Sequence, residues 1–261
     1  MPRANRHYLP GYVWHITHRC HQKEFLLKFP QDRHRYIHWL GEAKSRYGLS
    51  VLDYIVTSNH IHLLVNDTGR DAISRSMQLI AGRTGQEYNR REKCKGAFWE
   101  DRYHATIVQT NRHLLSCMVY IDLNMVRAGV VGRPEEWAEG GYAEMLNKED
   151  TVAVIDRGAW QSILGFADIL HAPYQQAISD MMQNQCRGRQ PMWSESIAVG
   201  DEAYVVETKR RLLSMGRGRK ALPFKDAYVL REPHLSYDVH NNILKMENTI
   251  YWDNNNHDSD T

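Results

Sequence analysis

The amino-acid sequence predicts an α+β fold, in which a split βαβ antiparallel sheet carries helices on its faces and a mostly helical C-terminal extension follows. Three observations predict this class. Over residues 1–133, strand-like runs alternate with segments that have apolar residues at helical spacing. Their order is strand, helix, strand, strand, helix, strand, helix. A stretch at residues 134–150 that contains proline, glycines and acids then precedes mixed helical segments.

The first strand, helix and hairpin each have a local signature. Residues 12–19 are rich in β-branched and aromatic side chains, which favours a strand. Residues 31–47 carry apolar side chains at helical spacing, and Gly48 follows as a typical residue after a helix end. Residues 50–57 and 60–66 predict two strands joined by a tight turn.

Three further elements complete the sheet and its helices. Residues 71–91 predict a helix with a basic outer face, and the aromatic-rich residues 97–108 predict a strand. A last helix, capped at Thr110 or Asn111, is expected to run to Ala128. This order of elements is that of ferredoxin-like or RRM-like split βαβ sheets.

The composition of the chain changes after this region. We expect a first domain over residues 1–147, a mostly helical extension over 148–252 and a disordered tail over 253–261. The tail has no apolar content, so it cannot bury a core. Within the extension, a helix over about residues 201–215 is expected to end in a basic loop at 216–220.

Charge is distributed unevenly along the chain. Residues 1–133 hold 20 Lys and Arg against 11 Asp and Glu (net +9), whereas residues 134–261 hold 13 against 20 (net −7). A basic first half suggests a polyanionic partner, although a chance fluctuation on a solvated surface gives the same count.

The sequence also excludes several classes of protein. No apolar run reaches the roughly 20 residues of a membrane span, and the N-terminus lacks the apolar segment of a secretory signal. The four cysteines lack CxxC spacing, which indicates reduced thiols, and no GxxxxGK[ST] motif is present. We therefore expect a cytoplasmic protein with neither a membrane partner nor a nucleotide cofactor.

The first candidate site is the His-x-His pair in residues 59–65, NHIHLLV. Side chains alternate faces along a strand, so His60 and His62 project together while Ile61 and Leu63 face the opposite way. Two neighbouring imidazoles are natural metal ligands. One such pair is also expected by chance among 14 histidines, so a structural role stays open.

The second candidate site lies in the helix NRHLLSCMVYIDLNMVRAG. Leu114, Met118 and Ile121 follow helical spacing and predict its core-facing side. Tyr120 and Asn124 are four residues apart, so the helix presents a phenol and an amide to the same place. A tyrosine packed at the helix edge is the alternative.

Together these motifs resemble a known family. NHIHLLV, then FWEDRYH, then YIDLNMVRAGVV resemble, in order and spacing, the HUH single-tyrosine transposases, and among them the REP-associated tyrosine transposases. The resemblance covers about residues 6–145, and residues 188–213 resemble the C-terminal extension of longer members. Met125 stands where the commonest form of the family has proline, which removes a helix kink rather than a chemical group.

The resemblance implies a set of roles. Tyr120 would be the nucleophile, and His60, His62 and Asn124 would bind Mg²⁺ or Mn²⁺. Single-stranded DNA with hairpin ends would be cut and rejoined through a 5′-phosphotyrosine, by a monomer or a homodimer. Residues expected to contact DNA, from the resemblance and from local positive charge, are Arg6, Arg19, Arg83, Arg102, Arg127, Arg217, Arg219 and Lys220.

Two other functions remain open at this point. A split βαβ sheet with aromatic side chains also suits a DNA- or RNA-binding protein, including a catalytically silent, domesticated transposase. A metallohydrolase would instead hold Zn²⁺ with His60, His62 and one of Glu100, Asp101 or His104, and would form no protein–DNA adduct.

Overall fold

The structure is a computed structural model that describes residues 9, 11–110, 112–146, 153–166, 169–183, 188, 190–212, 218–231, 235–238 and 243–246. Its helices are α1 (Pro30–Tyr47), α2 (Ala72–Arg91), α3 (Arg112–Asp122), α4 (Asn124–Arg127), α5 (Gly141–Leu146), α6 (Arg157–Leu164), α7 (Ala172–Gln183), α8 (Met192–Glu195) and α9 (Glu202–Arg211), with 3₁₀ turns at His21–Lys23 and Pro134–Glu136. Its strands are β1 (Val13–Arg19), β2 (Ser50–Val56), β3 (His60–Asn66), β4 (His104–Val108), β5 (Ala198–Gly200), β6 (Lys220–Phe224), β7 (Ala227–Arg231), β8 (Leu235–Asp238) and β9 (Ile243–Met246).

A seven-stranded sheet organises the fold. Its order is β2-β3-β1-β4-β5-β7-β6, and every neighbouring pair is antiparallel except β4 and β5. Strands β8 and β9 form a separate hairpin. The α+β class is confirmed. The extension also contributes three strands, β5, β7 and β6, to the sheet of the first half.

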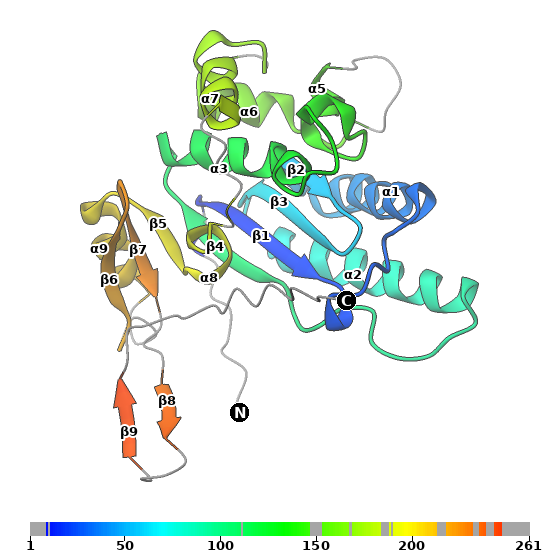
Figure 1. Cartoon of the computed structure of the whole chain (residues 1–261), viewed down its shortest axis with the longest axis horizontal. Coiled ribbons are helices and arrows are strands. Elements are labelled where there is room, and N and C mark those ends of the chain that lie inside the picture. The colour runs from blue at the N-terminus through cyan, green and yellow to red at the C-terminus, as the bar shows by residue number, and fades with distance from the viewer. Residues whose placement is uncertain are drawn as a thin grey trace, which may run out of the picture.

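Helices cover both faces of the first four strands. Helices α1 and α2 pack side by side on one face, and α3 crosses the other, with α5, α6 and α7 beyond it (Figure 1). Strand β2 lies between α1 and the α3–α5–α6 layer, so all seven of its residues are buried. Ile61 and Leu63 of β3 lie in the core, as strand alternation predicted.

Two expected elements differ in length from the structure. Only His104–Val108 of the expected strand 97–108 is a ladder strand. The aromatic residues before it pack against α2 instead: Trp99 donates its indole N–H to the Ala81 carbonyl, and the Phe98 ring meets that of Tyr88. Trp99 also forms an isolated antiparallel bridge with Cys20, so this segment combines packing against α2 with one point of backbone pairing.

The expected helix 110–128 is interrupted at Leu123, which separates α3 from α4. Backbone bonds still run from Leu123 N to Val119 O and from Arg127 N to Leu123 O, so the direction of the chain is kept. The expected tail 253–261 lies outside the described residues. Within the described part of the chain, no helix combines the length and apolarity that a membrane crossing requires.

Candidate active site

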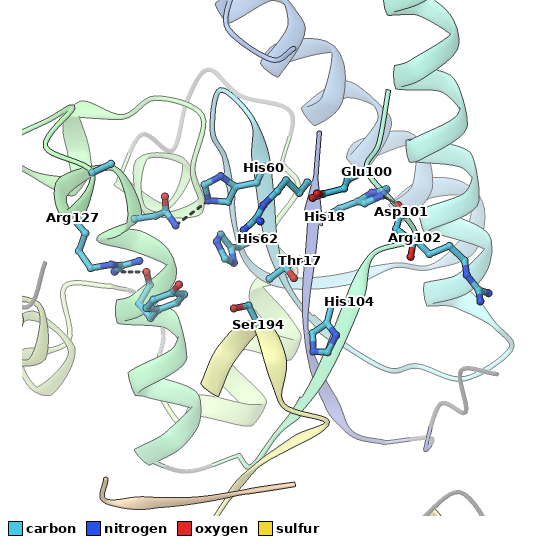
Figure 2. Close-up of a pocket in the computed structure, with 14 residues that line it drawn as sticks. Thr17, His18, His60, His62, Glu100, Asp101, Arg102, His104, Arg127 and Ser194 are labelled. Atoms are coloured by element: carbon cyan, nitrogen blue, oxygen red, sulfur yellow. Dashed lines mark hydrogen bonds between the residues drawn. The ribbon is translucent and has the colours of Figure 1, made fainter. Parts of the chain in front are cut away.

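A cleft of about 630 Å³ opens where β1, β3 and β4 meet the break between α3 and α4. Figure 2 shows its side chains converging from the sheet, from the helix pair and from α8. The lining residues are Thr17, His18, Arg19, His60, His62, Glu100, Asp101, Arg102, His104, Tyr120, Asn124, Arg127, Ala128 and Ser194.

The histidine pair enters the cleft from β3. His60 and His62 lie on one face of the strand, with ring centroids 5.1 Å apart. The opposite face is buried in the core, which fixes the register of β3 and holds both imidazoles toward the cleft. His62 is buried and His60 is partly exposed at the strand end.

Tyr120 and Asn124 enter the same cleft from the helices. The Tyr120 ring lies edge-on to His62, with centroids 5.7 Å apart and an interplanar angle of 90°. One turn later, Asn124 Nδ2 lies 3.4 Å from His60 Nε2 (Figure 2). The four side chains named from the two sequence motifs therefore lie together in one cleft.

Comparison with known proteins assigns the first half of the chain. Residues 10–124 match the family model described as IS200-like transposase. This part of the chain is therefore similar to the IS200-like transposases. No curated protein matches the sequence.

Two solved structures are similar to this chain. One, a REP-associated tyrosine transposase bound to a REP hairpin, has 17% identity, a TM-score of 0.47, and an alignment over 58% of this chain and 90% of its own. The other, a putative transposase from Deinococcus radiodurans, has 13% identity and a TM-score of 0.28 over 49% of this chain and 97% of its own.

Arg127 packs against the tyrosine of the cleft. Its guanidinium carbon lies 4.0 Å from the centroid of the Tyr120 ring, and its Nη1 donates to the Tyr120 carbonyl at 2.7 Å (Figure 2). Burial lowers the pKa of Arg127, and the interaction with Tyr120 opposes that shift. This contact places a cation directly over the phenol.

The hydrogen bonds of His60 define which of its nitrogens faces the cleft. Its Nδ1 lies 2.7 Å from Asn59 Oδ1, and the Asn59 amide nitrogen donates to the Lys23 carbonyl. That second bond orients the amide, so Asn59 Oδ1 accepts a proton from His60 Nδ1. A neutral His60 then presents the lone pair of Nε2 toward Asn124.

Burial lowers the pKa of His62 well below its ordinary value, and His15, His60, Arg127 and Arg19 add to the shift. His62 is therefore neutral at physiological pH and able to act as a metal ligand. Burial likewise lowers the pKa of the neighbouring His15 to about 3.

The donor set suits a divalent cation. Asn124 Nδ2 lies 3.4 Å from His60 Nε2, and the rings of His60 and His62 have centroids 5.1 Å apart. Imidazole nitrogens and a carboxamide oxygen are donors that divalent cations accept. Among the described residues, no group of three or more His, Cys, Asp or Glu side chains is placed to hold a metal ion. The ligand set of the metallohydrolase alternative is therefore not assembled in this part of the chain, although Glu100, Asp101 and His104 line the same cleft.

The arginines expected to contact DNA fall in three places. Arg19, Arg102 and Arg127 line the cleft. Arg83 lies elsewhere on α2, in a shallow groove of about 460 Å³ with Arg75 and Tyr47. Arg219 precedes Lys220, the first residue of β6, whereas Arg6 and Arg217 lie outside the described residues.

Sequence reasoning missed several contributors to the site. Thr17 and His18 on β1 and Ser194 on α8 line the cleft. His15 on β1 contacts His62, and the Trp193 carbonyl on α8 contacts His15. The alternation of His15, Thr17 and Arg19 along β1 was a visible signal for a polar strand face. Nothing in the sequence of α8 indicated its position, because that position depends on the pairing of β5 with β4.

Proposed function

We propose that this chain is a transposase that cleaves and rejoins single-stranded, hairpin-associated DNA through a covalent bond to Tyr120. The proposal assigns His60, His62 and Asn124 as ligands of Mg²⁺ or Mn²⁺. One observation carries it: the phenol of Tyr120 lies against His62 while Asn124, one helical turn later, meets His60. A pure binding protein does not require a nucleophile and three neutral metal ligands in one cleft.

The proposed step exchanges one phosphodiester bond for another. Tyr120 Oη forms a bond to phosphorus and loses its proton, while the bond from phosphorus to the 3′ oxygen breaks and that oxygen gains a proton. The products are a 5′-phosphotyrosine and a free 3′ hydroxyl. Reversal by the same or another 3′ hydroxyl rejoins DNA, so the reaction needs no nucleotide cofactor.

Several groups of the chain contribute to this step. A divalent cation bound by the three neutral ligands would supply Lewis acidity at a non-bridging phosphate oxygen. Arg127 lies over one face of the Tyr120 ring, where its positive charge would stabilise the phenolate as it develops. Arg19 and Arg102 also line the cleft, where they would meet the phosphates that flank the scissile bond.

The hairpin part of the proposal rests on two supports. The REP-associated transposase structure contains a REP hairpin. In this chain, the first half has a net charge of +9 (20 Lys and Arg minus 11 Asp and Glu), which favours a polyanion.

Incubation of the protein with 3′-labelled hairpin DNA and Mg²⁺ or Mn²⁺ tests the proposal. We expect an adduct that survives denaturation, because the 3′ fragment carries the phosphate that Tyr120 attacks. Tyr120→Phe should form no adduct, and chelation of the metal should prevent it in the wild type. Tyr88→Phe, which changes a tyrosine on α2 outside the cleft, is the matched control.

The same experiment tests the alternative function. If the wild type binds the hairpin but forms no adduct with either metal, the proposed enzymatic activity is rejected. That result would favour a catalytically silent, domesticated transposase that acts as a DNA- or RNA-binding protein. An adduct that persists in Tyr120→Phe would instead show that a residue other than Tyr120 is the nucleophile.

A further inference from the structure

We infer that His15 is a positioning residue of the metal site, which works with the Trp193 carbonyl to hold His62 in the tautomer that presents Nε2 to the cation. This inference rests on the proposed function, because it assumes that His62 is a metal ligand. Neither residue belongs to the His-x-His or Tyr120–Asn124 motifs. Trp193 also lies outside the segment 10–124 that matches the transposase family.

Strand register brings the two histidines together. Thr17 pairs with His62 and His15 pairs with Leu64, so His15 and His62 are diagonal neighbours on one face of β1 and β3. Their rings are nearly parallel, at 7°, and His15 Nε2 lies 2.9 Å from His62 Nδ1. Both side chains are buried, so water does not compete for this hydrogen bond.

The direction of each hydrogen bond follows from the carbonyl at the end of the chain of contacts. His15 Nδ1 lies 2.8 Å from Trp193 O, and a carbonyl oxygen only accepts, so Nδ1 carries the proton. The two ring nitrogens of His15 contact this carbonyl and His62. Within the described part of the chain, neither nitrogen therefore contacts a carboxylate that would stabilise a second proton on the ring. The buried ring is therefore neutral, and its Nε2 carries a lone pair.

The proton between the two histidines must then belong to His62. Because His15 Nε2 accepts, His62 Nδ1 donates, and the lone pair of His62 is on Nε2. Asn59 does the same for His60 through its carboxamide oxygen. Metal-bound histidines commonly donate their other ring N–H to an acceptor, which fixes the tautomer and orients the ring.

The anchor of this arrangement comes from the C-terminal extension. Trp193 is 1% exposed, and its carbonyl also accepts from the Thr106 hydroxyl at 3.2 Å. The same hydroxyl hydrogen is shared with the Ser196 carbonyl, which lies closer at 2.6 Å, so Thr106 of β4 contacts the backbone of α8 and of the residue that follows it. The parallel pairing of β5 with β4 holds the segment that follows. The extension therefore sets the proton position on a proposed ligand of the first half.

Substitution of His15, read out by metal binding in the absence of DNA, tests the inference. His15→Phe keeps a planar ring and removes the acceptor, so we expect the Mn²⁺ dissociation constant to rise about 10- to 100-fold. His15→Gln keeps an acceptor oxygen and should retain part of the affinity. His113→Phe, which changes a buried histidine on α3 away from the cleft, controls for the loss of a buried imidazole and should bind Mn²⁺ as the wild type does.

Nitrogen-15 NMR of the metal-free wild type gives a second measurement that does not depend on any variant folding. We expect His62 to be protonated at Nδ1 and His15 at Nδ1. A His62 protonated at Nε2, or His15→Phe with wild-type Mn²⁺ affinity, would overturn the inference. So would a wild type that binds no Mn²⁺.

These outcomes are distinct from failure of the proposed function. Wild-type protein that binds Mn²⁺ through His62 but forms no DNA adduct would reject strand transfer and leave the role of His15 standing. An adduct that depends on Tyr120, together with unchanged Mn²⁺ affinity in His15→Phe, would support strand transfer and reject the role of His15.

Discussion

The guanidinium of Arg127 lies 4.0 Å from the Tyr120 ring and donates to the Tyr120 carbonyl, so one side chain holds both the ring and the backbone of the proposed nucleophile. Asn124 lies between them in the sequence and faces His60. Asn124 is the first residue of α4, which follows the interruption at Leu123. The position of the phenol therefore depends on α4 as well as α3.

Arg127→Ala should slow adduct formation about 100-fold, because it removes a preorganised cation from beside the developing phenolate. Arg127→Lys should be intermediate, since it keeps the charge but not the planar contact with the ring. The rate of adduct formation at saturating hairpin DNA measures both. Arg112→Ala, at the exposed start of α3, is the control. Equal rates for Arg127→Ala and Arg112→Ala would show that the contact has no part in catalysis.

Asn124→Ala should weaken Mn²⁺ binding by about tenfold or more, because it removes one of three proposed donors. Asn124→Asp keeps an oxygen donor and adds negative charge, so it should bind Mn²⁺ at least as tightly as the wild type. Titration calorimetry without DNA measures both. Asn89→Ala removes a carboxamide on α2 that bonds to Gly96 and should leave Mn²⁺ affinity unchanged. A match between Asn124→Ala and Asn89→Ala would remove Asn124 from the ligand set.

The local geometry of the site was predictable from the sequence because it depends on short-range periodicity. Alternation along a strand placed His60 and His62 on one face, and helical spacing placed Tyr120 beside Asn124. That the two pairs meet was a prediction from the resemblance, and the structure places them in one cleft. Their catalytic and metal-binding roles stay predictions.

The contribution of the extension was not predictable by the same reasoning. Strand β5 has three residues, too few to show a period, and its parallel pairing with β4 joins segments about 90 residues apart. Strand β6 contains Pro223, which argues against a central strand but suits the sheet edge where it lies. The position of Trp193 depends on the pairing of β5 with β4, so no local sequence pattern could predict its contact with His15.

Stability should depend on pH through Asp53, a buried residue on β2. Burial raises its pKa well above the ordinary 3.8, and Asp122 and Glu144 raise it further. Asp53 Oδ1 accepts from the Tyr54 N–H, whereas Oδ2 has no hydrogen-bond partner among the described residues. The folded protein therefore keeps a proton that the unfolded chain releases once the pH passes about 3.8.

Rising pH thus favours the unfolded state from pH 3.8 up to the folded-state pKa, by at most about 1.4 kcal/mol per pH unit for this one proton. Asp53→Asn cannot release a proton and retains the acceptor for Tyr54. The free energy of unfolding of Asp53→Asn, relative to that of the wild type, should therefore increase as pH rises through this range. Urea denaturation at several pH values measures the difference. Asp180→Asn, on the exposed side of α7, controls for the loss of one charge, and parallel curves for Asp53→Asn and wild type would contradict the prediction.

Gly141→Ala should destabilise the fold by about 1–3 kcal/mol, because α5 begins against β2 with no space for a side chain. A Cβ at Gly141 would collide with Asp53 Oδ1 and lie 3.1 Å from the Tyr54 backbone nitrogen. Gly82→Ala is the matched control, since its Cβ would meet nothing within 4 Å inside α2. Alanine favours helix there by up to about 1 kcal/mol, so Gly82→Ala should be neutral or stabilising. Thermal denaturation compares the two variants, and a Gly141→Ala protein as stable as Gly82→Ala would refute close packing of α5 on β2.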